Sequence, residues 1–297
     1  MKILITGASG LIGSKLIPFL SDEGHSITRL TRSRTGGSLE TAYWDPERGE
    51  IEGGKLEGHD AVVHLAGESI EGRWTSEKKR RIEESRVRGT RLLAETLSGL
   101  DSKPRVVVAA SGIGYYGDRG EEVLTEESGP GAGFLARLSI KWEGALGPAA
   151  DAGIRLVNMR LGIVLAPYGG ALSRMLPPFR LGLGGRMGSG KQYWSWIAID
   201  DVLSAIYHSL VSDYLRGPVN FTSPGPVTNS EFAEALGDAL ARPAIFRIPA
   251  FALRVFLGEM ADETMLSSTR AVPSRLLGSG FKFRYPDIKS ALKHLLS

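Results

Sequence analysis

The chain has 297 residues, of which 42% are hydrophobic and 23% charged, a composition typical of a folded globular protein of about two domains. It contains no cysteine, so disulfide scaffolds, zinc fingers, iron–sulfur clusters and cysteine nucleophiles are excluded. Because 36 basic residues nearly balance 33 acidic ones, the net charge of +3 gives little reason to expect a nucleic-acid partner.

Short aliphatic runs alternate with longer helical stretches through the first half of the chain. The predicted strands are residues 2–6, 26–30, 61–65, 105–110 and 155–159. The predicted helices are residues 11–22, 76–97, 134–150, 200–211 and 229–240. Such alternation is typical of βαβ units around a parallel sheet. We therefore predict an α/β fold: a doubly wound parallel sheet of Rossmann type with a smaller, α-rich C-terminal domain.

The pattern also suggests a domain organisation. We predict a dinucleotide-binding domain over residues 1–165, to which a return segment at about 196–224 belongs. Residues 166–195, rich in glycine, proline and aromatic side chains, are predicted to form loops over a substrate cleft. A small domain over residues 225–297 completes the chain.

The sequence gives no sign of membrane insertion. Its longest apolar stretches fall far short of the roughly 20 residues that span a bilayer. The chain starts at once with a strand-like run and a glycine turn, which leaves no room for a secretion signal. We therefore expect a cytoplasmic protein without a membrane partner.

A glycine-rich turn, Thr6-Gly-Ala-Ser-Gly-Leu-Ile-Gly13, follows the first predicted strand and opens the first predicted helix. Gly7 suits a tight turn, Gly10 lets the backbone approach a pyrophosphate, and Gly13 lets the helix pack closely on the strand. The alternative is a flexible turn without a ligand. The placement between strand and helix favours dinucleotide binding, with contacts from Gly7, Ser9, Gly10, Leu11, Ile12 and Gly13.

The end of the second predicted strand bears on which dinucleotide is bound. An acidic residue there would bind a ribose 2′-hydroxyl, whereas cations accommodate a 2′-phosphate. This chain has Thr31, Arg32, Ser33 and Arg34. We therefore expect NADP as the cofactor, with NADPH preferred over NADH, although a solvated basic turn would have the same sequence.

The chain resembles a known family, the extended short-chain dehydrogenase/reductases, and within it the atypical NADP-binding branch of "epimerase family proteins". The resemblance covers nearly the whole chain. The matching segments are TGASGLIG from Thr6, AVVHLAGE ending at Glu68, RVRGTRLLAETL from Arg86, SGIGYYG from Ser111, FLARLSIKWE from Phe134, LPPFRLGLGGRMGSGKQYWSWI before Ala198, and a C-terminal unit from about Arg247.

The resemblance implies positions for the cofactor. It places the phosphates on the glycine turn and the 2′-phosphate at Thr31 and Arg32. The remaining implied contacts are Leu65, Ala66 and Gly67 at the adenine-side ribose and pyrophosphate, Arg86 near the cofactor, and Val164 beside the nicotinamide. Arg86 also lies in a charged run that could be an exposed helix face.

The family's usual catalytic pair is missing. Family members carry a tyrosine and a lysine spaced YxxxK on a helix, so that the ammonium group promotes proton transfer at the phenol. If Glu143 is aligned with the glutamate that follows this lysine, Leu135 and Ser139 fill the two positions. If Lys141 is aligned instead, Arg137 fills the tyrosine position.

Three hydroxyl groups remain as catalytic candidates. They are Ser111, directly after the predicted strand 105–110, and Tyr115 and Tyr116 a few residues further on. Either tyrosine could present a phenol to the nicotinamide side of the cleft. The alternative is that the tyrosines are structural or contact the substrate.

The aromatic tract supplies candidates for substrate binding: Arg186, Lys191, Gln192, Tyr193 and Trp194. These side chains suit a small polar ligand with a sugar-like face. We expect Trp194 to be partly exposed within reach of the nicotinamide, and Trp196 to be a packing residue. The same tract matches the start of a phosphate-binding P-loop, but Gln192 stands where a hydroxyl residue should hold Mg²⁺. We expect no metal.

Two functional hypotheses follow. The first is an NADP(H)-binding protein of the extended short-chain dehydrogenase type, acting as a nucleoside-sugar epimerase/dehydratase-like oxidoreductase without the YxxxK pair. The second is a non-catalytic NADP-sensing or scaffolding protein. In either case, helices 76–97 and 134–150 would pair into a homodimer, as is common in this fold.

Overall fold

The computed structural model describes residues 1–33 and 40–297. Its strands are β1 (Lys2–Thr6), β2 (Ser26–Thr31), β3 (Glu40–Asp45), β4 (Glu50–Ile51), β5 (Ala61–His64), β6 (Val106–Gly112), β7 (Val123–Leu124), β8 (Arg155–Leu161), β9 (Ile163–Leu165), β10 (Gly185–Met187), β11 (Tyr193–Trp194), β12 (Trp196–Ala198), β13 (Gly217–Phe221), β14 (Val227–Thr228), β15 (Phe246–Ile248) and β16 (Arg270–Ala271). Its α-helices are α1 (Gly13–Asp22), α2 (Ser76–Ser98), α3 (Phe134–Gly144), α4 (Gly147–Asp151), α5 (Gly170–Arg180), α6 (Ile199–Val211), α7 (Asn229–Leu240), α8 (Ala250–Leu257), α9 (Ser274–Gly278) and α10 (Ile288–Leu296). The shorter helical turns are η1 (Gly53–Leu56), η2 (Ile113–Tyr116) and η3 (Ala261–Met265).

The central sheet has the order β13-β8-β6-β5-β1-β2-β3-β4. Its pairings in the described part of the chain are parallel except between β3 and β4. The chain runs outward from β1 through β2 and β3, then returns to the other side of β1 for β5, β6, β8 and β13. The order therefore reverses between β1 and β5, which in open α/β sheets is where ligands bind, beyond the carboxyl ends of the strands. The predicted doubly wound α/β fold is confirmed.

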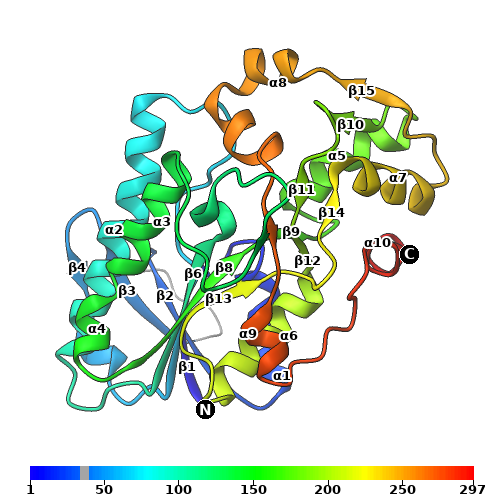
Figure 1. Cartoon of the computed structure of the whole chain (residues 1–297). Coiled ribbons are helices and arrows are strands. Elements are labelled where there is room, and N and C mark those ends of the chain that lie inside the picture. Colours follow the sequence, from blue (N-terminus) through cyan, green and yellow to red (C-terminus); the bar gives the residue numbers. More distant parts are fainter. Residues whose placement is uncertain (34–39) are drawn as a thin grey trace.

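Helices cover both faces of this sheet, as Figure 1 shows. Successive strand residues point to opposite faces, so Ile3 joins one apolar cluster and Leu4 the other. The first cluster includes Leu16 of α1 and Val202 of α6, and the second includes Leu93 of α2. Burial on both faces explains why the central strands are almost continuously apolar.

Two helix predictions need correction. The predicted helix 134–150 is divided into α3 and α4, because Pro148 has no N–H to donate to the carbonyl of Gly144. The predicted loop region 166–195 contains helix α5, whose Leu172, Leu176 and Phe179 are buried at helical spacing. The two prolines inside α5 and the glycines around it obscured that spacing in the sequence.

The C-terminal part of the chain returns to the central sheet. Strand β16 pairs in parallel with β7, and α9 packs on β13. Leu276 of α9 and Leu292 of α10 belong to the same apolar cluster as Ile3 of β1. Among the described residues, no helix has the length and apolar character needed to cross a membrane.

Candidate functional site

The glycine turn after β1 has little room for side chains. Gly7 has a φ of +67°, and a Cβ there would lie 2.7 Å from the carbonyl carbon of Leu65. A Cβ on Gly13 would lie 2.3 Å from the carbonyl oxygen of Gly7. Helix α1 begins at Gly13, and no side chain caps its N-terminus. The backbone therefore forms a cradle that a dinucleotide pyrophosphate fits, and the helix dipole favours an anion there.

The rest of this turn faces a second loop. Ser9 and Gly10 are exposed, whereas Leu11 and Ile12 are half-buried. A Cβ on Gly169 would lie 2.7 Å from the Leu11 side chain, so the loop after β9 packs directly against the glycine turn. Val164 is the central residue of β9 and is half-buried. The structure thus brings the predicted nicotinamide-side residue near the predicted phosphate site.

A buried hydrogen-bond chain holds the next segment of the site in place. The hydroxyl oxygen of Thr6 accepts the N–H groups of Leu65 and Ala66, at 3.0 and 3.1 Å. With its lone pairs used in this way, Thr6 donates its own proton to Nδ1 of His64, 2.8 Å away. His64 then carries its proton on Nε2 and donates it to the Thr90 hydroxyl at 2.9 Å. The chain ties β1, β5 and α2 together behind the predicted ribose site.

Gly67 and Arg86 meet at the edge of this segment. A Cβ on Gly67 would lie 3.3 Å from the guanidinium carbon of Arg86. Arg86 donates to the carbonyl of Glu68 at 2.8 Å and lies over the Trp142 ring. Burial lowers the pKa of Arg86 to about 10, only partly offset by the charge of Glu68. Arg86 therefore forms a partly desolvated wall of the site beside Gly67, and does not lie on a solvated helix face.

The end of β2 lies beside the end of β1, since Leu30 is paired with Thr6. Thr31 is half-buried, and its hydroxyl accepts the N–H of Ser33. Arg32 is exposed at the same edge. Arg34 lies outside the described residues. The edge thus offers a hydroxyl and a cation to a 2′-phosphate.

An ion pair lies under the end of β6. Glu143 of α3 accepts the Ser111 hydroxyl proton at 2.7 Å. The same carboxylate receives two parallel hydrogen bonds from Arg160 of β8, both at 2.9 Å. Burial lowers the pKa of Arg160, but the hydrogen bonds and charge of Glu143, with help from Tyr116, raise it overall. Sequence reasoning used Glu143 only to align the helix and missed Arg160, because no spacing relates residues on α3 and β8.

The two tyrosines of η2 have different environments. Tyr116 is fully buried, donates to Asn220 at 2.8 Å and accepts from Arg160 at 3.1 Å. Burial raises the pKa of this phenol, against the opposing effect of Arg160. The prediction that Tyr116 could present a phenol to the cleft is therefore wrong. Tyr115 is half-buried, its ring 3.5 Å from the Arg160 guanidinium, and it stays a candidate with Ser111.

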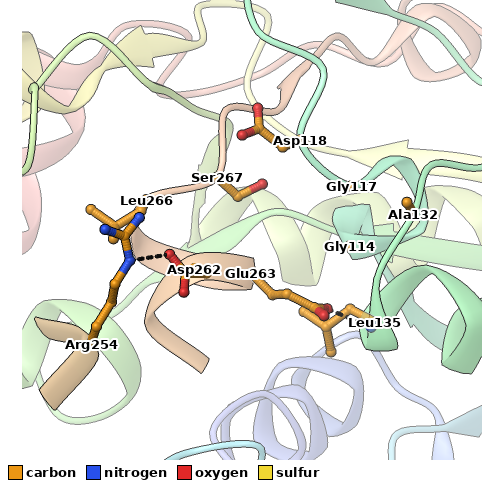
Figure 2. A pocket seen from close by; sticks show the side chains of 10 residues that line it. All are labelled: Gly114, Gly117, Asp118, Ala132, Leu135, Arg254, Asp262, Glu263, Leu266 and Ser267. Atoms are coloured by element: carbon orange, nitrogen blue, oxygen red, sulfur yellow. Dashed lines mark hydrogen bonds and ion pairs between the residues drawn. The ribbon is translucent and has the colours of Figure 1, made fainter. Parts of the chain in front are cut away.

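A cavity of about 260 Å³ lies beside η2, with Gly114, Gly117, Leu135, Asp262 and Glu263 in its lining (Figure 2). Glu263 accepts the N–H groups of Phe134 and Leu135, at 2.6 and 2.7 Å, and so caps α3 from the C-terminal part of the chain. A Cβ on Gly114 would lie 2.9 Å from the Leu135 side chain. Leu135, which fills the tyrosine position in the alignment that matches Glu143, therefore contacts the turn that follows β6.

Two of the predicted substrate residues are packing residues. Trp194 is 3% exposed, its indole N–H donates to Met265 at 3.2 Å, and its ring packs on Phe232. The expectation of a partly exposed lid residue is wrong, because β11 pairs with β14 and buries this ring in the core. Gln192 is also buried, and its amide nitrogen donates to the carbonyls of Met187 and Met265.

The remaining residues of the tract are exposed at the surface or pack against other segments of the chain. Arg186 is exposed and lines a different cavity, against α7. Lys191 is exposed, and Tyr193 is half-buried under the guanidinium of Arg270 at 4.6 Å. Trp196 is fully buried, as expected of a packing residue. No group of three His, Cys, Asp or Glu side chains that could hold a metal occurs in residues 1–33 and 40–297.

Comparison with known proteins extends these observations. The profile of the NAD dependent epimerase/dehydratase family matches residues 3–216, and a domain of unknown function, DUF1731, matches residues 248–295. An epimerase family protein of Mycobacterium bovis is 42% identical over 98% of this chain and 96% of its own length. The crystal structure of human epimerase family protein SDR39U1 (isoform 2), solved with NADPH, is 34% identical, with a TM-score of 0.92 over 100% of this chain and 99% of that one. A structure described as the nucleoside-diphosphate sugar epimerase from Corynebacterium glutamicum is 36% identical, with a TM-score of 0.82, over 100% of this chain and 58% of that one.

Proposed function

This chain belongs to the NAD dependent epimerase/dehydratase family, as its motifs indicated, and we propose that it is an NADP(H)-dependent oxidoreductase acting on a small polar, sugar-like substrate. The observation that carries the proposal is the edge where the sheet order reverses. There the glycine cradle, the Arg86 wall and the Ser111 hydroxyl follow β1, β5 and β6.

The cofactor half of the proposal depends on how well the glycine cradle and the end of β2 suit the phosphates of NADPH. The cradle around Gly7 and Gly13 excludes side chains and presents an uncapped helix N-terminus. Arg32, beside Thr31, supplies a cation for the 2′-phosphate, and the described end of β2 has no carboxylate before Glu40. NADPH is therefore preferred over NADH, in keeping with the NADPH in the human relative's crystal structure.

The chemical half rests on Ser111. When bound, the nicotinamide would supply or accept the hydride. Ser111 is 4% exposed and its proton points at Glu143, so a substrate hydroxyl that reaches this edge would donate to the other lone pairs of the serine oxygen. Because Arg160 neutralises Glu143, this pair orients the serine without acting as a strong base on it. Tyr115, half-buried beside Arg160, is the remaining candidate for a proton donor.

Titration of the purified chain with NADPH and NADH tests the cofactor half. NADPH should bind more tightly, and Arg32→Ala should weaken NADPH roughly 10- to 100-fold, the value of a charged hydrogen bond, while barely changing NADH. Arg91→Ala, which removes another exposed arginine, on α2, is the control. Equal affinities in the unmodified chain would refute the preference.

A screen of sugar-like alcohols, aldehydes and ketones, followed by nicotinamide absorbance, tests the chemical half. With an accepted substrate, Ser111→Ala should lower kcat about 100-fold and leave the NADPH affinity unchanged. Ser209→Ala removes another buried hydroxyl, in α6, and should leave both values unchanged. Full turnover by Ser111→Ala would remove Ser111 from the mechanism.

A non-catalytic NADP sensor is the second candidate, and the position of Leu135 favours it. This apolar side chain contacts the turn after β6, and Ser139, which fills the lysine position in the alignment that matches Glu143, is buried. Both candidates predict tight NADPH binding and a thermal shift. Binding without hydride transfer to any member of the panel would decide for the sensor.

The expected homodimer stays a proposal. It would pair α2 with α3 and α4 across a two-fold axis. The exposed side of α2 carries ion pairs such as Arg80 with Glu77 and Glu84, which must remain paired or solvated in such an interface. A monomer mass in sedimentation equilibrium at micromolar protein would overturn it. The absence of a nucleic-acid partner and the cytoplasmic location also stay predictions.

A further inference from the structure

Exposed apolar side chains are concentrated in two short segments. Of the thirteen large hydrophobic residues that are exposed in the described chain, seven lie between residues 181 and 183 or between 245 and 256. They are Leu181, Leu183, Ile245, Phe246, Phe251, Val255 and Phe256. The two phenylalanines of α8 are 69% and 76% exposed. Clusters of this kind on a folded protein mark interaction surfaces.

The two segments are neighbours in space. Strand β10, just after Leu183, pairs in parallel with β15, which contains Phe246. Pro249 then leads directly from β15 into α8. Figure 1 shows β10, β15 and α8 along one edge of the molecule, away from the central sheet. We call the seven side chains and the cations described next the α8 face.

Helix α8 is unusual within this fold. Its sequence is AFALRVFL, yet it has no buried residue. Phe251 and Val255 lie one turn apart on the same side, and Phe256 is beside them. The other side of the helix is only partly covered: Leu253 is half-buried, and Leu257 packs against the apolar cluster that contains Trp74. The two phenylalanines of α8 are therefore available to contact a lipid surface or a second protein molecule.

The α8 face is also positively charged. Residues 180–191 and 241–258 contain no acidic side chain, but they contain the exposed cations Arg180, Arg186, Lys191, Arg242, Arg247 and Arg254. Arg254 is paired with Asp262 at 2.8 Å, and Glu234 and Asp238 of α7 border the cavity beside Arg186. A symmetric contact with a second copy would place these cations against each other.

We propose that the α8 face docks the protein on an anionic lipid surface. Phenylalanine side chains suit the boundary between headgroups and acyl chains, and arginines suit lipid phosphates. The prediction of no membrane partner depended on the lack of a spanning stretch, and a helix lying in the interface needs none. The proposal does not depend on the chemistry at Ser111.

Co-sedimentation of the purified full chain with vesicles tests the proposal. Vesicles with about 30% phosphatidylglycerol in phosphatidylcholine should bind at least tenfold more protein than phosphatidylcholine alone, and binding should fall as NaCl rises from about 0.05 to about 0.5 M. The double variant Phe251→Ser with Phe256→Ser should reduce binding at least tenfold. Val211→Ser with Tyr214→Ser, which removes exposed apolar side chains elsewhere, is the matched control.

NADPH-induced thermal shifts of each variant establish that it is folded before its binding is scored. Absence of binding to the anionic vesicles overturns the proposal, as does binding that the α8 double variant leaves unchanged. If the unmodified chain does not bind vesicles but is a dimer, and the double variant is a monomer, the α8 face binds a second copy of the chain instead. Binding to acidic peptides without binding to vesicles assigns it to a protein.

Discussion

Mild acid should destabilise this protein through a single buried imidazole, that of His64. The ring is fully buried, with Nδ1 accepting from Thr6 and Nε2 donating to Thr90. A second proton on the ring would have to displace the Thr6 hydroxyl proton and bring a charge into the core. Burial accordingly lowers the pKa of His64 from 6.5 to about 4.

The sign and size of the effect follow from this difference. Between pH 6.5 and 4 the unfolded chain binds a proton that the folded chain rejects, so stability is complete above pH 6.5 and falls as the pH is lowered. The loss from this group is about 2 kcal/mol at pH 5 and reaches about 3 kcal/mol below pH 4. About 2 kcal/mol is a large part of the typical stability of a domain.

Urea unfolding at pH 7.5 and pH 5, followed by tryptophan fluorescence without cofactor, measures the effect. His64→Asn keeps an acceptor for Thr6 but cannot become charged, so it should be less stable than the unmodified chain at pH 7.5 by about 1–3 kcal/mol. It should also lose about 2 kcal/mol less between the two pH values. Carboxylates titrate in both proteins, so their contribution cancels in the difference. Identical losses in the two proteins would refute the reasoning.

Three substitutions test the rest of the site. Gly13→Ala should weaken NADPH binding more than tenfold in a fluorescence titration, because its Cβ would meet the glycine-turn backbone, whereas Gly54→Ala, which has open space around it, should bind normally. Glu143→Ala leaves the buried guanidinium of Arg160 without its carboxylate and should cost about 3–5 kcal/mol in urea unfolding; a cost below about 1 kcal/mol would mean that water replaces the pair. Glu263→Ala removes the acceptor of two N–H groups of α3 and should cost about 1–2 kcal/mol, with Glu263→Gln costing less; equal costs would contradict a capping role.

The sequence by itself determined the elements whose signals are local. The apolar run of β1, the glycine spacing after it and the regular alternation that follows predicted the doubly wound sheet and the phosphate cradle, because each depends on neighbours within one turn or one strand. Cations at the end of β2 bear on the choice of cofactor for the same reason. The missing YxxxK pair was also visible without a structure.

Only the tertiary structure decided which side chains face the site. Arg160 of β8 and Asn220 of β13 hydrogen-bond to Tyr116 and hold it away from the cleft, and no spacing in the sequence indicates that these residues meet. Trp194 lies in a glycine- and aromatic-rich tract of the kind that forms lids, but the pairing of β11 with β14 places its ring in the core. Burial and long-range hydrogen bonding depend on how distant segments pack against one another. Local sequence patterns do not contain this information, because the packing involves the whole chain.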